Sequence, residues 1–342
     1  MREKSLTAVS QPYTFSGLFT LALRIVAGWT YFSAFWRRLI LENKLDPDGA
    51  GYIGEKFNHF LPNALAIGPL IEYLVTHEEA LWWFMLVFTI VEGVVGLLLM
   101  VGFFTRLMSI GVFALASGIL LGAGWLGTTC LDEWQIGVLG IAAGFTVFLS
   151  GGGKISLDHY LSSKLKRFDR TVRLRSGDLG LEERKLTKIV LSGTAFIVFL
   201  TLFTNQYFHG GVWGKLHNLS VRPNIQISNA VLERGELSFT VYRDQGADVY
   251  GSFLIGILLK DTSEKIVFQK QAEHLSKMLP ENIQNEYVAK VKPGKHSLVI
   301  PLGAKANLKL KEKELSGLPK GTYRIELVDI SGLVWKETVE IN

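Results

Sequence analysis

The chain has 342 residues, 48% of them hydrophobic, and a formal net charge of +5 at neutral pH. The apolar residues gather in long runs between residues 15 and 205, which is typical of a membrane protein and unlike an ordinary soluble domain. Because Cys130 is the single cysteine, the sequence excludes an internal disulfide, a CxxC redox pair and a cysteine zinc site. The basic residues are concentrated in one loop, so the net charge indicates membrane topology and not nucleic-acid binding.

Five apolar segments approach the length of about 20 residues that a helix needs to cross a bilayer. The stretch before the first segment is polar and shows no A-x-A cleavage site, so we expect that segment to be a retained helix. The sequence therefore predicts a four-helix membrane domain over residues 1–160 and a fifth transmembrane helix over residues 189–205. The segments lie at residues 15–41, 80–104, 107–126, 133–149 and 189–203.

The distribution of basic residues predicts the orientation of these helices. Residues 154–188 contain ten Lys or Arg residues, whereas the loop between the third and fourth segments contains none. By the positive-inside rule, the N-terminus and the basic linker 161–188 are cytoplasmic, and residues 206–342 are extracytoplasmic. Arg37 and Arg38 are an exception, because they end the first helix on the outer side.

Residues 42–79, between the first two helices, are interrupted by several Gly and Pro residues and contain amphipathic stretches. We expect this segment to form an outer cap that roofs a cavity between the helices. Gly-rich helix faces such as GVVG are compatible with a homo-oligomer.

After residue 205 the apolar pattern changes to short alternating runs separated by turn sequences such as DQGAD and KPGK. Strands at this spacing predict a small antiparallel, Ig-like sandwich over residues 206–342. One interpretation of this domain is that it is simply an interaction or capping module. The expected strands lie at residues 237–242, 252–259, 266–269, 297–301, 323–328 and 334–340.

Two charged residues lie inside the apolar helices, Arg24 in the first and Glu92 in the second. Charges within a membrane are costly, so each is a functional candidate with an expected partner. Their depths agree within about a turn, which predicts one buried ion pair. The pair is either a structural clamp or lies beside a quinone head group, where Glu92 relays a proton and Arg24 polarises a carbonyl. Trp29 and Gln135 complete the predicted quinone site.

Arg37 and Arg38 have two interpretations, as lipid-phosphate contacts or as an anion site at the outer mouth of the bundle. Cys130 lies in the outer loop TTCLDEW at the start of the fourth helix, where it is either inert or a catalytic thiol. Asp132 is a favourable residue before a helix but also a candidate site residue, as is Trp134.

The sequence contains no GxGxxG fingerprint, no P-loop, no CxxCH and no HExxH motif. Neither a flavin, a haem nor a metal is therefore indicated. Any redox chemistry is expected to use a carrier dissolved in the membrane.

The membrane half resembles the DoxX superfamily, and within it the DoxD subunit of thiosulfate:quinone oxidoreductase. The segments LRIVAGWTYF, VEGVVGLLLMVGFFTR, CLDEWQIG and GGGKISLD carry this resemblance. From about the fifth helix onward, with the segment GGVWGKLHN, the chain is similar to the DoxA subunit. The resemblance implies a fusion of both subunits.

That resemblance implies an enzyme in the cytoplasmic membrane of a prokaryote that oxidises thiosulfate to tetrathionate and passes electrons to a quinone. We expect one thiosulfate to add to the quinone, or to oxidised Cys130, before a second attacks it. Arg37 and Arg38 would hold the dianions, with Lys215 and His217 contributing if the β domain folds over the bundle mouth. The alternatives are quinone-linked oxidation of another sulfur compound, or a non-enzymatic anchor with a partner-binding β domain.

Overall fold

The computed structural model describes residues 15–49, 51–124, 126, 133–164, 176, 179, 181–217, 219, 221–247 and 251–341. These residues form two compact units. The first unit contains the long apolar helices, and the second contains all the described strands together with the short helices that follow residue 52.

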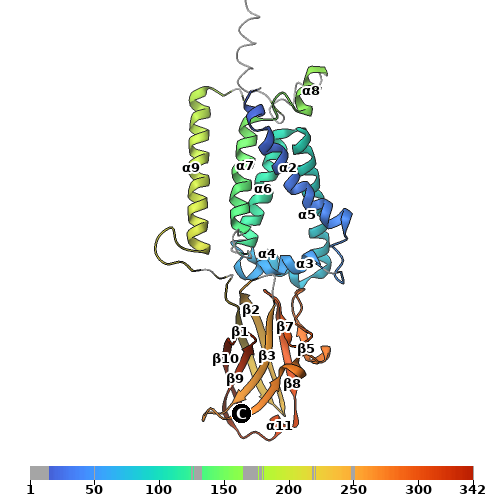
Figure 1. The fold of residues 1–342 in the computed structure, drawn as a ribbon, viewed down its shortest axis with the longest axis vertical. Helices are drawn as coiled ribbons and strands as arrows, with labels where there is room; N and C mark the ends of the chain where they lie inside the picture. Colours follow the sequence, from blue (N-terminus) through green and yellow to red (C-terminus); the bar gives the residue numbers. More distant parts are fainter. Residues whose placement is uncertain are drawn as a thin grey trace, which may run out of the picture. The chain divides into compact units, whose positions relative to one another are not determined.

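Each of the five apolar segments contains a helix (Figure 1), whereas the number of membrane-spanning helices stays a prediction. The first segment ends differently from the prediction, because α2 gives way to the wider π-helical turn η1 at its C-terminal end. The elements are α2 (Leu21–Phe35), η1 (Trp36–Leu41), α5 (Glu78–Val101), α6 (Thr105–Ala123), α7 (Glu133–Ser150), α8 (Leu157–Lys164) and α9 (Glu183–Phe208).

Four helices, α2, α5, α6 and α7, share one apolar core. Small residues bring α2 and α5 close together: a Cβ added to Gly28 would lie 2.7 Å from the carbonyl oxygen of Gly96. A Cβ on Gly96 would in turn meet the backbone of Phe32. Buried residues of this core are Tyr31, Val95, Leu99, Val112, Leu115 and Val147.

Helix α9 stands apart from this core and runs beside α7 (Figure 1). It contacts α7 where Gly193 meets the ring of Phe145, yet none of its most apolar window is buried. Within the described residues, α5, α6 and α9 are long and apolar enough to cross a membrane, while the apolar α7 is shorter. These helices support a membrane location, because exposed apolar side chains of this kind need lipid around them.

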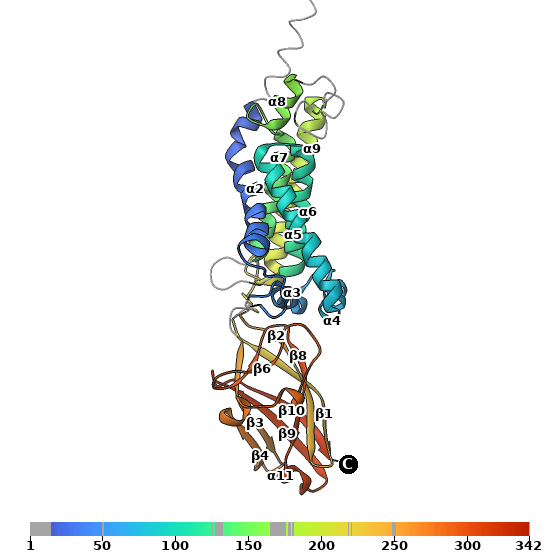
Figure 2. The ribbon, with the colours of Figure 1, turned by 90° about the vertical axis from the view of Figure 1, so that its right-hand side faces the viewer.

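The second unit is built on two antiparallel sheets that enclose one hydrophobic core (Figure 2). One sheet has the order β1-β2-β8-β5, and the other has the order β10-β9-β3-β7-β6 with β4 also paired to β3. The strands are β1 (Asn224–Glu233), β2 (Glu236–Gln245), β3 (Ser252–Lys260), β4 (Ile266–Gln271), β5 (Ile283–Asn285), β6 (Lys292–Pro293), β7 (Leu298–Ile300), β8 (Lys305–Lys311), β9 (Gly321–Asp329) and β10 (Val334–Ile341).

The predicted all-β, antiparallel character of this region is confirmed, whereas the Ig-like connectivity stays a prediction. All six predicted strands are present, but the sequence analysis missed β1, β8 and the short β5 and β6. Three short helices, α10 (Ala272–Leu275), η4 (Pro280–Asn282) and α11 (Lys313–Ser316), connect the strands.

The expected outer cap is helical, as α3 (Ile53–Phe60), η2 (Leu61–Asn63) and α4 (Gly68–Thr76). Its helices belong to the same compact unit as the β strands, although the sequence analysis grouped them with the membrane helices.

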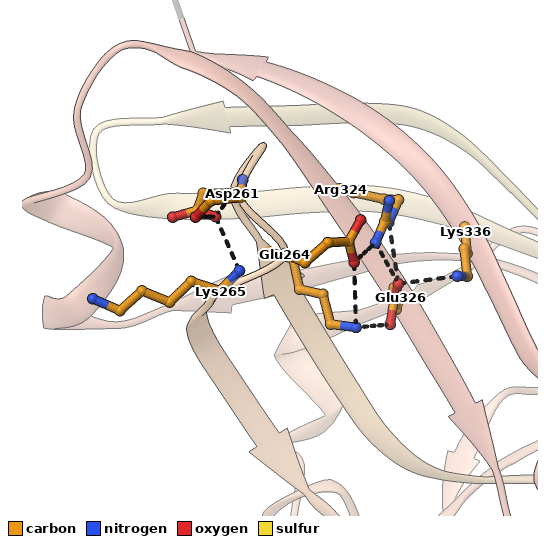
Figure 3. A network of polar contacts seen from close by, with 8 residues as sticks. Asp261, Glu264, Lys265, Arg324, Glu326 and Lys336 are labelled. Carbon is orange, nitrogen blue, oxygen red and sulfur yellow. Dashed lines mark hydrogen bonds and ion pairs between the residues drawn. The ribbon is translucent and has the colours of Figure 1, made fainter.

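A network of charged side chains ties three neighbouring strands together on the outer face of the second sheet (Figure 3). The Glu326 carboxylate on β9 pairs with Lys260 on β3 at 2.7 Å and with Lys336 on β10 at 3.3 Å. Arg324 pairs with both Glu326 and Glu264. Burial raises the pKa of Glu326 but the bonds from Lys260 and Lys336 lower it, and the net pKa lies below the usual value.

Candidate functional site

The strongest candidate site in the first unit is an ion pair between Arg38 on η1 and Glu92 on α5. The Glu92 side chain is 4% exposed and the Arg38 side chain 24% exposed. A carboxylate this deeply buried requires a partner, because removing its counter-charge would leave an uncompensated charge in an apolar core. The charge of Glu92 inside the bundle is therefore offset by Arg38.

Arg37 and Arg38 are adjacent in the π-helical turn η1 and have different environments, because neighbouring residues of a helix point in different directions. Arg37 is exposed, and its Nε donates to the carbonyl oxygen of Ser33 on its own helix at 3.2 Å. Arg38 is half-buried and reaches Glu92. Irregular turns of this type occur frequently at functional sites. Of the two predicted anion-binding arginines, one is thus turned outward and one is joined to the predicted proton carrier.

Two further polar residues lie near this pair and were missed by the sequence analysis. Tyr31 on α2 is buried, and its phenol interacts electrostatically with Glu92. Thr89 is 0% exposed, and its hydroxyl has no hydrogen-bond partner among the described residues. Because it precedes Glu92 by three residues on α5, it lies on the same helix face. In the sequence, the position of Thr89 three residues before the intramembrane Glu92 was the signal that could have identified it as a site residue.

The predicted ion pair between Arg24 and Glu92 is wrong. Arg24 is 3% exposed, and its guanidinium donates to the carbonyl oxygens of Gly152 and, at 2.7 Å, Ile155. The turn that follows α7 presents these carbonyls because Gly151 and Gly153 both have positive φ angles, 67° and 65°. Arg24 therefore clamps this turn to α2, and the predicted contact with a quinone stays untested.

Asp158, in the GGGKISLD segment, holds the same end of the bundle together. Its carboxylate accepts the backbone N–H groups of Phe104 and Thr105, each at 2.9 Å, at the start of α6. It also accepts the hydroxyls of Thr105, at 2.8 Å, and Ser176, at 3.0 Å. A carboxylate at a helix N-terminus satisfies donors that the helix cannot pair internally. The GGGKISLD segment, which is one of the segments that carry the family resemblance, therefore has a role in holding the helices together.

The structure separates the remaining predicted residues of the bundle. Trp134 is 5% exposed, its ring centre lies 6.0 Å from that of His209, and its indole N–H is buried without a hydrogen-bond partner in the described part of the chain. Gln135 follows it on α7 and is half-buried. Trp29 is 55% exposed on α2, which is the environment of a lipid-facing side chain.

Several predicted residues cannot be placed in a common site. Lys215 and His217 are both exposed, in the segment after α9. Cys130 and Asp132 lie outside the described residues. Among the residues that are described, no group of three or more His, Cys, Asp or Glu side chains is arranged to hold a metal ion.

Comparison with known families divides the chain in two. Residues 19–181 match the family described as TQO small subunit DoxD, and residues 208–338 match the family described as TQO small subunit DoxA. The Arg38–Glu92 pair falls in the first match, and the strands fall in the second. The chain therefore belongs to the DoxD and DoxA subunit families of thiosulfate:quinone oxidoreductase, joined in one polypeptide.

Proposed function

We propose that this protein oxidises thiosulfate to tetrathionate and reduces a membrane quinone, with the Arg38–Glu92 pair at the centre of the reaction. The observation that carries the proposal is this buried pair within the DoxD half of a membrane protein of the thiosulfate:quinone oxidoreductase families. A quinone is apolar and resides in the bilayer, so a polar group held inside the bundle is well placed to meet its head group.

The chemistry requires both charge compensation and protons. Two thiosulfate dianions form one S–S bond and release two electrons as tetrathionate is made. The quinone accepts those two electrons and two protons. Glu92 is the residue that we assign to proton delivery, since a carboxyl group can give and regain a proton at a fixed position. Arg38 holds that carboxylate in place and offsets its charge.

The residues around the pair fit a quinone carbonyl. The buried hydroxyl of Thr89 lacks a partner among the described residues and shares a helix face with Glu92. An unpaired buried hydroxyl costs free energy, and a carbonyl oxygen would satisfy it. Trp29, Arg24 and Gln135 remain secondary candidates for contacts with the ring.

Thiosulfate is expected to approach from the extracytoplasmic side. Arg37 is exposed near the start of η1 and suits recruitment of a dianion. Lys215 and His217 are further exposed candidates, and Asp132 and Trp134 belong to the same predicted site. In this orientation the N-terminus and the basic linker are cytoplasmic.

The test is thiosulfate-dependent reduction of a soluble quinone analogue by the purified protein, with tetrathionate counted as product. We expect one tetrathionate per quinone reduced. Glu92→Gln and Arg38→Ala should lower kcat by about 100-fold, the usual range for loss of a proton-transfer group. Arg37→Ala should raise the KM for thiosulfate and leave kcat nearly unchanged. Arg184→Ala, the same charge change at the exposed start of α9, is the control.

The outcomes separate the alternatives. Full turnover in Glu92→Gln would refute the central role of the pair, and an unchanged KM in Arg37→Ala would refute recruitment by that residue. Turnover with a different sulfur compound, but not with thiosulfate, would change the substrate. No turnover with any of them would favour a non-enzymatic anchor.

The role of Cys130 has its own test. Loss of turnover in Cys130→Ala would support a route in which a thiosulfate sulfur is carried by the cysteine, with the quinone as oxidant. Full turnover would support transfer without a covalent enzyme adduct.

A further inference from the structure

The segment formed by α3, η2 and α4 connects the two families in one structural unit. It lies inside the DoxD match, which covers residues 19–181. It nevertheless packs in the same compact unit as the strands of the DoxA match, which covers residues 208–338. The contacts between these two parts are therefore contacts between a DoxD-type and a DoxA-type sequence.

One contact is made by the amide side chain of Asn58 on α3, which is 0% exposed. Its Nδ2 donates to the carbonyl oxygen of Gly303 at 2.8 Å, and its Oδ1 accepts the backbone N–H of Ala289 at 3.0 Å. One side chain thus satisfies two backbone groups from separate segments of the β domain. Without Asn58 both groups would be buried and unpaired, which proteins rarely tolerate.

The β domain is shaped to receive this amide. Gly303 has a φ of +72°, a conformation that residues with a Cβ rarely adopt. A Cβ at this position would also collide with the backbone of Asn58 and lie 2.8 Å from its Nδ2. The turn before β8 therefore needs glycine both for its conformation and for the close approach of α3.

A second contact lies at α4. The hydroxyl of Tyr287 donates to the Glu72 carboxylate at 3.0 Å. Burial, and then the bond to Glu72, raise the pKa of the Tyr287 hydroxyl, so it stays a neutral donor. The Tyr242 ring packs edge-on against Tyr287 with ring centres 6.4 Å apart, which fixes the position of the donor.

We infer that residues 53–76 are the surface by which a DoxD-type membrane domain binds a DoxA-type β domain, and that this binding does not require the two to be one chain. The contacts of Asn58 and Glu72 go to residues 287–303. None of these bonds involves residues 209–217, the segment that leads from α9 to the strands. Since the amide pairs with backbone groups, recognition depends on the shape of the β domain more than on its side chains.

The test separates the two parts after folding. A specific protease site is inserted between Gly211 and Lys215, where the chain is exposed, and an affinity tag is placed at the N-terminus. The intact protein is purified in detergent, bound through the tag and cut, and the released β domain is measured over time. We expect it to be retained in the unchanged protein. Asn58→Ala should release it about tenfold faster or more.

Two further variants complete the experiment: a control and a smaller change to the proposed contact. Gln284→Ala removes an exposed amide on β5, outside residues 53–76 and 287–303, and should behave as the unchanged protein. Tyr287→Phe removes one hydroxyl and is expected to fold normally, so it tests the surface even if Asn58→Ala does not fold. It should also speed release, by up to about tenfold.

Two results would overturn the inference. One is immediate loss of the β domain from the unchanged protein after cutting. The other is equal retention in Asn58→Ala, Tyr287→Phe and the unchanged protein. The readout is retention and not turnover, so it stands whether or not the proposed reaction is correct.

Discussion

Replacing Asp158 with alanine should destabilise the membrane unit more than any single loss of a surface charge. The carboxylate is 2% exposed and accepts four hydrogen bonds, two of them from backbone N–H groups at the start of α6. Those bonds also hold Phe104 at a φ of +48°, which is unusual for an aromatic residue. Alanine would leave this strained turn without its anchor.

The size of the effect follows from the groups left unpaired. Thr105 is 0% exposed, so its N–H would lose the full value of a buried hydrogen bond, and Phe104 would lose part of that value. At about 1–3 kcal/mol for each buried unpaired group, the expected loss is about 2–4 kcal/mol. For a chain of this size that corresponds to a fall of about 3–6 °C in melting temperature.

The assay is thermal unfolding of the purified protein in detergent, followed by the fluorescence of its tryptophans. Asp158→Asn keeps one carbonyl acceptor and should fall between the alanine variant and the unchanged protein. Asp48→Ala, at an exposed position, is the matched control. If Asp158→Ala melts within about a degree of Asp48→Ala, the reasoning that this carboxylate anchors α6 is refuted.

Three other outcomes are expected. Gly96→Ala should lower stability by about 1–3 kcal/mol, because its methyl group would meet the backbone of α2, whereas Gly118→Ala, where a Cβ meets nothing within 4 Å, should not; equal melting temperatures would contradict this packing. Thr89→Val should raise the KM for quinone about tenfold and leave the KM for thiosulfate unchanged, and a parallel change in both would count against a carbonyl contact. The stability that Glu326 adds depends on its ionised form: since its folded pKa is lowered, that stability is present at neutral pH and is lost as the pH falls below about 4. Hydrogen exchange of β9 should therefore accelerate in acid, and Glu326→Gln should remove most of the pH dependence; an unchanged acid response would show that other groups control it.

The helical half of the fold could be predicted from the sequence because long apolar runs have few alternatives in a membrane. The partner of Glu92 could not. Depth along a helix can be counted from the sequence, but the direction in which a side chain points depends on packing. Arg24 has a suitable depth yet turns toward carbonyl groups of a Gly-rich turn, and such backbone acceptors leave little trace in the sequence.

There are also physical reasons why the sequence analysis did not predict some of the strands. β1 contains Asn229 at a φ of +51°, and its register shifts between Ser228 and Val231, so the alternation is interrupted. β8, with the sequence KANLKLK, alternates regularly, and its lysines face outward while its Ala and Leu residues are buried. Lysine and alanine have low strand preference, which hid that alternation.

The π-helical turn has a consequence for how this protein can vary. Each residue of an α-helix advances about 100° around the axis, so inserting one residue before Arg37 would rotate every later side chain by that angle. Arg37 would then take the inward place that Arg38 has here, and Arg38 would take the place of Leu39. The acid on α5 would still face an arginine, but one from the preceding position of the pair. Which arginine is equivalent between two relatives is therefore set by the winding of η1, and position in an alignment would mislead wherever the length of that turn differs.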